Sequence, residues 1–233
     1  MPNQTVVPPG GQFQPPASSQ EPLVAFRCSP VFRPYLEEDA KDVAFIVDSP
    51  IVYQYTQGAS PISFQTSGSG CSDLGTLYIT ISIGNQLFAG KGITVNTTGQ
   101  VISVDISSLS TQKTSYNVTC NAAYQSDTLL SPTTQYFSAN TSLLYLPGTK
   151  GSVVKTDLRT GALWVRPTDG KGGPFQPFIP QGFYVSFEQQ LANNLSLIDQ
   201  LKADGFNTVR ADTIPSISYD ANAFTDSPDP SLR

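Results

Sequence analysis

The side chains available for chemistry in this 233-residue chain are carboxylates, tyrosines, lysines and arginines, because the sequence contains no histidine. The lack of histidine excludes Ser-His-Asp and Cys-His nucleophile systems, together with metal sites built on imidazole. The glutamates are Glu21, Glu37, Glu38 and Glu188. The first three precede or open a β-rich region, and Glu188 falls in the first turn of a predicted helix, where a carboxylate serves the helix dipole. We therefore expect no catalytic residue, no metal site and no cofactor in this chain.

One arginine and two aspartates lie around the last apolar segment of the chain. The stretch GFNTVR, which ends at Arg210, is typical of a glycine at a helix end followed by a short buried strand. Asp204 and Asp212 flank this strand. An aspartate at a helix end and one in a loop are ordinarily solvated, so we assign neither of them a catalytic role.

The composition excludes some partners. The chain has 13 basic and 18 acidic residues, a formal charge of −5, and no cluster of lysines and arginines, so we expect no nucleic-acid partner. No apolar run approaches the roughly 18 to 20 residues that a membrane span requires, and we expect no span and a monomer. Charged residues make up only 13%, so Ser, Thr, Asn and Gln must cover much of the surface, as is common in secreted proteins.

Sequons also favour secretion. The motif N-x-[ST] begins at Asn3, Asn96, Asn117, Asn140 and Asn194. The first residues, MPNQTVVPPGGQFQPPASSQEP, lack the basic and apolar regions of a signal peptide. We therefore predict a secreted or cell-wall protein whose true N-terminus lies elsewhere. The alternative is a cytosolic chain with accidental sequons.

Three cysteines permit one disulfide and one free thiol. Alternation places Cys28 in LVAFRC and Cys120 in YNVTC on the core-facing sides of two strands, whereas Cys71 lies in the loop-like segment TSGSGCSDLG. We favour a Cys28–Cys120 disulfide. The alternative is three unpaired thiols, as in a reducing compartment.

These residues must be positioned by a largely β scaffold. Residues 1–21 are rich in Pro, Gly, Gln and Ser and are predicted to be a disordered lead-in. Residues 22–147 contain regularly spaced short apolar or alternating runs separated by turn residues, which predicts a β-sandwich. The runs are VAFIVDS, IVYQYT, ISFQT, TLYITISI, GITVNTT, VISVDIS, SYNVTCNA and LLYLP.

Leu109 and Tyr116 are similar in spacing to the tyrosine corner of immunoglobulin-like and fibronectin-like sandwiches. In such a corner, the tyrosine hydroxyl donates a hydrogen bond back across the connection between two strands. A plain core tyrosine is the alternative for Tyr116.

The pattern changes after the sandwich. Residues 148–179 are predicted to be a β connector, and residues 180–233 then show an apolar strand, a helix and a second strand. Ser186 and Gln189 form a capping box, and Gly205 ends the helix. The helix presents an apolar stripe of Phe187, Leu191, Leu195, Ile198 and Leu201. The segment therefore predicts one βαβ unit, which needs further strands or a partner surface to be stable.

The order of these segments resembles a known enzyme family. A β-sandwich followed by LRTGALWVRPTDGKGGPFQPFIPQGFY, a helix and LKADGFNTVR resembles the start of the (β/α)8 barrel in retaining glycoside hydrolases of the clan that contains families 2 and 5. The likeness extends to secreted fungal glycoside hydrolase-like proteins. It covers about residues 157–212, while the sandwich matches only in type. We therefore expect an immunoglobulin/fibronectin-like sandwich, a connector and an incomplete barrel.

The resemblance implies a role for Arg210. In the family, the matching arginine lies at the carboxyl end of the second barrel strand, beside the nucleophilic carboxylate. The two catalytic glutamates, about 5 to 5.5 Å apart, come from later strands, which this chain does not reach. The resemblance therefore implies an N-terminal part of a protein that acts on polysaccharide or glycan and is not itself catalytic.

Two readings outside catalysis are also open. One is a secreted β-sandwich that binds carbohydrate on aromatic side chains, with Tyr53, Tyr55, Tyr78 and Trp164 as candidates. The other is a structural cell-wall protein with no ligand.

Overall fold

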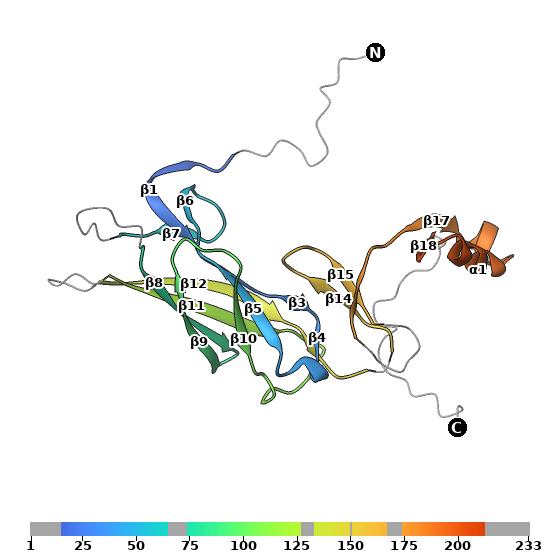
Figure 1. Ribbon diagram of the computed structural model, residues 1–233, viewed down its shortest axis with the longest axis horizontal. Helices are drawn as coiled ribbons and strands as arrows, with labels where there is room; N and C mark the ends of the chain where they lie inside the picture. Colours follow the sequence, from blue (N-terminus) through green and yellow to red (C-terminus); the bar gives the residue numbers. More distant parts are fainter. Residues whose placement is uncertain (1–14, 65–73, 127–132, 150, 167–173, 213–233) are drawn as a thin grey trace, which may run out of the picture. The chain divides into compact units, whose positions relative to one another are not determined.

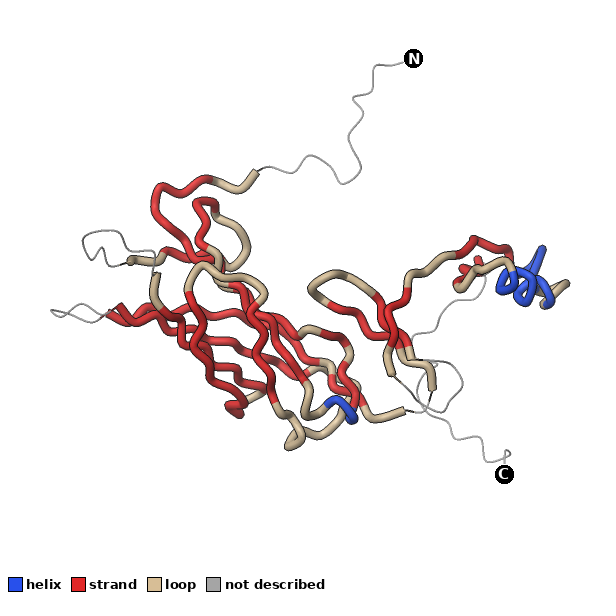
Figure 2. Tube along the Cα trace, in the orientation of Figure 1, coloured by secondary structure: helices blue, strands red, loops and turns tan. Residues whose placement is uncertain are grey.

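The computed structural model describes residues 15–64, 74–126, 133–149, 151–166 and 174–212 (Figure 1). The protein is mainly β, as the sequence predicts, and strands dominate its trace (Figure 2). It divides into two compact units, Met1–Phe178 (unit 1) and Ile179–Arg233 (unit 2). In the described part of the chain, no helix is long and apolar enough to cross a membrane.

Unit 1 is built from short strands and one 3-10 turn, η1 (Glu37–Asp39). In chain order its strands are β1 (Ser18–Ala25), β2 (Arg27–Pro30), β3 (Phe32–Arg33), β4 (Tyr35–Leu36), β5 (Val43–Asp48), β6 (Ile51–Gln54), β7 (Ala59–Pro61), β8 (Thr76–Ile83), β9 (Gln86–Thr94), β10 (Gln100–Val104), β11 (Tyr116–Ser126), β12 (Thr133–Leu143), β13 (Tyr145–Leu146), β14 (Val154–Asp157), β15 (Leu163–Val165) and β16 (Gln176–Phe178).

Two antiparallel sheets supply most of the core. One has the strand order β10-β5-β2, and the other has the order β12-β11-β8-β9. Burial alternates along β5 and β8, so each strand turns every second side chain inward. The inward residues of both sheets, such as Phe45 and Val47 of β5 and Ile79 and Ile81 of β8, belong to a single hydrophobic cluster.

The predicted disulfide is confirmed. Cys28 on β2 and Cys120 on β11 are joined, with their Cα atoms 6.3 Å apart, and the bond links the two sheets. Cys71 lies outside the described residues.

The N-terminal strand begins earlier than expected. Ser18 opens β1, which pairs with β6 and β7, although residues 1–21 were predicted to be a disordered lead-in. Leu23 and Val24 at the end of β1 are fully buried, and their antiparallel pairing extends the strand into the polar residues before them. Residues 1–14 lie outside the described part.

Residues of the predicted connector are part of unit 1. Strands β14, β15 and β16 form a four-stranded sheet with β3, in the order β16-β15-β14-β3, and β13 pairs in parallel with β4. The predicted connector, residues 148–179, is therefore paired through β14 with β3, a strand near the beginning of the chain.

Unit 2 contains the expected strand, helix and strand. Strands β17 (Gly182–Ser186) and β18 (Thr208–Asp212) pair in parallel, and two helical segments lie between them in the chain. Gly205, with a φ of +93°, follows the second helical segment, as predicted.

The prediction of one continuous helix was wrong. The structure has a π-helical turn, η2 (Phe187–Leu191), and a separate α-helix, α1 (Ser196–Ala203). Between them, the Asn194 side chain accepts hydrogen bonds from the backbone N–H and the hydroxyl of Ser196, at 3.2 and 2.5 Å. This local Asx turn competes with helix continuation. The Ser186 hydroxyl oxygen accepts the predicted bond from Gln189 N, but the backbone N–H of Ser186 donates to Gln190 Oε1 in place of the Gln189 side chain.

Candidate functional site

Arg210 lies on β18, directly opposite Tyr184 of β17 in the parallel register. Its Nη1 donates a hydrogen bond to the Tyr184 hydroxyl at 3.1 Å, and the guanidinium carbon lies 4.9 Å from the centroid of the same ring. Both side chains are exposed. Arg210 has no ion pair with a described carboxylate, and the side chains of Asp212 and Glu188 lie outside the description. Asp204 is exposed at the end of α1.

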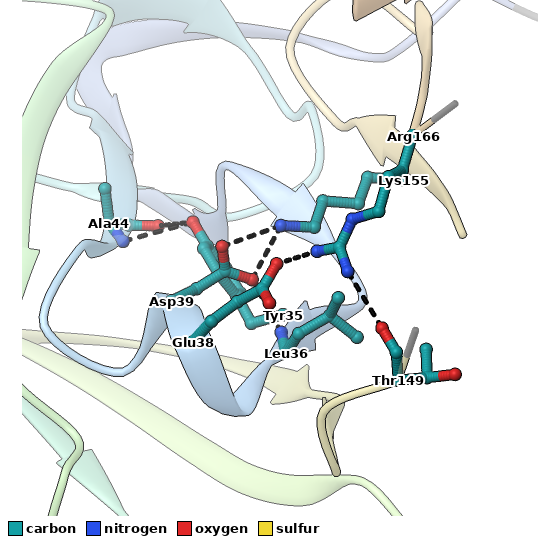
Figure 3. A network of polar contacts seen from close by, with 8 residues as sticks. All are labelled: Tyr35, Leu36, Glu38, Asp39, Ala44, Thr149, Lys155 and Arg166. Atoms are coloured by element: carbon teal, nitrogen blue, oxygen red, sulfur yellow. Dashed lines mark hydrogen bonds and ion pairs between the residues drawn. The ribbon is translucent and has the colours of Figure 1, made fainter. Parts of the chain in front are cut away.

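A second cluster of charged groups lies in unit 1 and was not predicted (Figure 3). Lys155 of β14 donates to both carboxylate oxygens of Asp39, at 2.7 and 2.6 Å. Arg166, which follows β15, forms an ion pair with Glu38 and donates to the Thr149 carbonyl oxygen at 2.9 Å. We call these two cations and their partners the buried cation cluster.

Strand alternation and acidic partners from η1 account for the burial of these cations. Alternation along β14 turns Lys155 and Asp157 to the same inward face. The side chains of Lys155 and Arg166 are only 6% and 3% exposed. A buried charge is tolerated only when it is paired, and the acidic turn η1 supplies the carboxylates of Glu38 and Asp39. The backbone N–H of Leu36 also donates to Asp39, at 2.6 Å, and helps to hold its carboxylate in place.

An aromatic ring covers both cations. The Phe175 ring centroid lies 3.9 Å from Lys155 Nζ and 4.8 Å from the guanidinium carbon of Arg166. Cation–π contacts of this kind gain strength where water is excluded. The cluster therefore combines two ion pairs with one shared ring.

A cavity of about 230 Å³ adjoins the Lys155–Asp39 pair. Phe32 packs edge-on against Trp164, with ring centroids 5.9 Å apart, and against Tyr35 at 6.2 Å. Trp164, one of the predicted aromatic candidates, is half-buried there. The lining residues are Phe32, Tyr35, Asp39, Asp42, Lys155, Trp164 and Phe175.

Tyr35 is held in its neutral form. Burial raises the pKa of its hydroxyl, against the opposing effect of its backbone hydrogen bonds. The hydroxyl donates to the Ala44 carbonyl oxygen at 3.0 Å and accepts from Ala44 N at 3.1 Å. Tyr35 thus serves as a fixed neutral wall of the cavity.

Among the described residues that line the cavity there are binding groups but no acid–base pair. Lys155 and Asp39 neutralise one another, and Asp42 is exposed at the rim with no side-chain partner among the described residues. An arrangement of this kind can orient an uncharged ligand against aromatic rings. In the described segments, no group of three His, Cys, Asp or Glu residues could hold a metal ion.

The three remaining tyrosine candidates for carbohydrate binding and the described sequon asparagines lie at the surface. Tyr53, Tyr55 and Tyr78 are each more than half exposed. The described sequon asparagines are also exposed, and Asn3 lies outside the described residues. These asparagines are Asn96, Asn117, Asn140 and Asn194.

Sequence reasoning missed the buried cation cluster, although one signal for it existed. Lys155 and Asp157 alternate with Val154 and Thr156, so one face of a predicted strand carried two charged residues. That pattern signals partners, but it does not say which partners. Comparisons of the chain with models of protein families, with curated proteins and with solved structures found no match.

Proposed function

We propose that this chain is the N-terminal, non-catalytic part of a secreted glycoside hydrolase-like protein that acts on a glycan. In this proposal, unit 1 is an immunoglobulin/fibronectin-like sandwich, and unit 2 is the first strand–helix–strand turn of a (β/α)8 barrel. The single observation that carries the proposal is the parallel pair of β17 and β18, with Arg210 at the middle of β18 (Thr208–Asp212).

Three features of unit 1 support the sandwich. The order β2-β5-β10 in one sheet and β9-β8-β11-β12 in the other follows the Greek-key pattern of such domains. The Cys28–Cys120 disulfide links the sheets, as the disulfide of antibody domains does. Tyr116, at the start of β11, donates from its hydroxyl to the Ser110 carbonyl oxygen at 2.5 Å, which is the bond expected of a tyrosine corner.

Two features of unit 2 support a barrel start. Parallel strands are joined through a crossover, and such connections belong to sheets covered on both faces. Gly182 also fits close strand pairing, because a Cβ there would overlap the Thr208 carbonyl oxygen.

Apolar surface in unit 2 supports the same proposal. Phe187, Leu195 and Ile198 are 46%, 66% and 44% exposed, and Phe183 is 51% exposed. An apolar hollow of about 420 Å³ lies beside β18 and is lined in part by Ile198. Exposed apolar area of this kind marks a surface that normally packs against something else. In a barrel it would pack against further strands and helices.

In this proposal, the catalytic carboxyl groups belong to the rest of the protein, and this chain contributes Arg210. Retaining hydrolysis needs an acid/base carboxyl and a nucleophilic carboxylate. Later strands would provide both, and Arg210 would donate two hydrogen bonds to the nucleophile and favour its ionised form. Tyr184, which now contacts Arg210, would help to orient the guanidinium.

Secretion is part of the proposal. A disulfide persists in oxidising compartments, and the exposed asparagines of four sequons are accessible to glycosylation. These observations fit a secreted or cell-wall location better than a reducing one.

The test has two steps. Sequencing of the transcript past Arg233 should show a continued reading frame with two glutamates at predicted strand ends. The encoded protein should hydrolyse a β-glucan, a mannan or a galactan. In that protein, Arg210→Lys should lower kcat/KM by roughly a hundredfold, because lysine cannot form the paired hydrogen bonds. The matched control, Arg159→Lys in unit 1, should leave kcat/KM unchanged. A stop codon directly after Arg233 in every transcript, or a longer product without hydrolysis, would contradict the proposal.

A further inference from the structure

Two exposed tyrosines lie in one row across the four-stranded sheet of unit 1. Tyr78 of β8 and Tyr136 of β12 are both directly opposite Ala123 of the strand between them, β11. Their exposed fractions are 57% and 77%. Both side chains stand on the outer face, because their neighbours Leu77, Ile79 and Phe137 point into the core.

The spacing of this row suits a chain of ring-shaped units. Tyr78 and Tyr136 are two strands apart, which places their Cα atoms roughly 10 Å apart. That span is comparable to the length of a disaccharide. The two rings make no contact with each other in the described structure, and the small Ala123 leaves the space between them open.

A glycine gives the Tyr78 ring its place. Gly92 of β9 is directly opposite Tyr78, and a Cβ on Gly92 would lie 3.9 Å from two atoms of the ring. The ring therefore lies beside Gly92, on the side away from Tyr136. Small residues between and beside the tyrosines leave their rings as the raised features of the sheet face.

The outward side chains of β8, β11 and β12 around the tyrosines are uncharged, and most of them are polar. The outward positions of β8, β11 and β12 that the structure describes carry no Asp, Glu, Lys or Arg. The adjacent row consists of Thr80, Asn121 and Ser138, roughly 7 Å along the strands from the tyrosines. These hydroxyl and amide groups both donate and accept hydrogen bonds.

We infer that this face, the Tyr78–Tyr136 platform, binds an uncharged polysaccharide chain that runs across the strands with one sugar ring on each tyrosine. Tyrosine offers a rigid apolar ring at low entropic cost, and the apolar side of a sugar ring can pack on it. Sugar hydroxyls would bond to Asn121 and its neighbours. No described outward side chain of β8, β11 or β12 could pair with the charges of a charged polymer. The inference rests on the proposed function only for the ligand class, a glycan.

A protein partner fits this face less well. Protein interfaces have a fully buried core that is more apolar than two tyrosines set among Ser, Thr and Asn. The sequon residue Asn140 is also on this face, four residues along β12 from Tyr136, or roughly 13 Å. Protein for the test should therefore come from a host that forms the disulfide but does not glycosylate asparagine.

The experiment measures binding of the purified chain to cellulose, chitin, β-1,3-glucan and mannan, with heparin as the charged comparison. We expect binding to at least one neutral polymer and none to heparin. Tyr78→Ala and Tyr136→Ala should each weaken that binding by about three- to tenfold. Tyr78→Phe and Tyr136→Phe, which keep the ring, should retain most of it. Tyr53→Ala removes an equally exposed ring from another sheet and should change nothing.

Several outcomes would overturn the inference. They are binding to none of the four neutral polymers, equal binding to heparin, and binding that both alanine variants retain at the wild-type level. Circular dichroism and urea unfolding should establish that each variant is folded, and the phenylalanine variants test the platform should an alanine variant unfold. If a longer protein hydrolyses a glycan but does not bind it at Tyr78 and Tyr136, the binding inference is wrong and the hydrolase proposal stands. If the chain binds a neutral polymer at these tyrosines and every transcript has a stop codon after Arg233, the hydrolase proposal is wrong and the binding inference stands.

Discussion

Lys155 Nζ lies within hydrogen-bond distance of both carboxylate oxygens of Asp39, at 2.7 and 2.6 Å, and so joins β14 to a turn 116 residues earlier in the chain. Because Lys155 is buried and Asp39 is only partly exposed, the sheet that contains β14 can pack on the rest of unit 1 only when the pair is formed.

Removal of one partner of this pair should destabilise unit 1. We expect Asp39→Asn to lower the free energy of unfolding by about 2 to 3 kcal/mol, since it leaves the Lys155 ammonium buried without a counter-ion. Urea unfolding at pH 7 measures the change. Arg27→Met breaks the more exposed Arg27–Asp48 pair, whose nitrogen and oxygen are 3.6 Å apart, and should cost at most about 0.5 kcal/mol. Equal losses in the two variants would contradict a special role for Lys155–Asp39.

Loss of the disulfide should cost more than any single hydrogen bond. The Cys28–Cys120 bond closes a loop with a sequence separation of 92, and the chain-entropy model gives about 4 kcal/mol for a loop of this size. Cys28→Ser/Cys120→Ser should show this loss in urea unfolding. Peptide mapping without reduction should find the Cys28–Cys120 crosslink and a single alkylatable thiol at Cys71. A crosslink that contains Cys71 would show that the pairing is different in solution.

The tyrosine at the start of β11 should stabilise the connection that precedes it. Tyr116→Phe removes the 2.5 Å hydrogen bond to the Ser110 carbonyl oxygen and should cost about 1 kcal/mol. Tyr53→Phe is the control, because the Tyr53 hydroxyl has no hydrogen-bond partner in the described structure and its removal should have almost no effect. Differential scanning calorimetry on both variants distinguishes a corner from a plain core tyrosine, for which the two changes would be alike.

A methyl group at residue 182 should separate the two strands of unit 2. Gly182→Ala places a Cβ against the Thr208 carbonyl oxygen, so amide exchange in β17 and β18 should become faster by about tenfold or more. Exchange in the strands of unit 1 should not change. At Gly90, a Cβ would meet only the Ile79 carbonyl oxygen at 3.9 Å, so Gly90→Ala should alter stability by less than about 0.5 kcal/mol. Unchanged exchange in β17 and β18 after Gly182→Ala would show that the pair is looser than described.

Asp157 should make the free energy of unfolding of unit 1 depend on pH. Hydrogen bonds from the Arg159 side chain hold the pKa of the Asp157 carboxyl below its usual value. A lowered pKa in the folded state means that this carboxylate stabilises the fold above its unfolded pKa of about 3.9, and that the stabilisation is lost as the pH falls through the folded value. Asp157→Asn should therefore flatten the decline in unfolding free energy below about pH 4. Urea titrations between neutral and acidic pH test this, and parallel profiles for wild type and variant would contradict it.

Features with a local period could be predicted from the sequence. Strands read from alternation, the stop at Gly205 and the inward positions of Cys28 and Cys120 all depend on residues within a few places of each other. The inward positions of two cysteines that can bond were enough to favour the observed disulfide. The prediction of one continuous helix was wrong because the Asn194 side chain accepts a hydrogen bond from Ser196 that competes with the helix. Hydrophobic spacing does not reveal such a bond.

Contacts between residues that are far apart in the chain could not be predicted from the sequence. Alternation along β14 places Lys155 on the face opposite Val154, but it does not say which face is buried. Tertiary packing turned Lys155 inward and set it against Asp39 of η1. Tyr78 lies in a predicted strand, but none of the predicted strand runs contains Tyr136, which falls on β12 in the structure. The alignment of the two tyrosines depends on the register of three strands. A shift of one residue in any pairing would send a tyrosine to the opposite face. Register is set by turns and by the sum of core contacts, and these are properties of the folded chain that no short stretch of sequence contains.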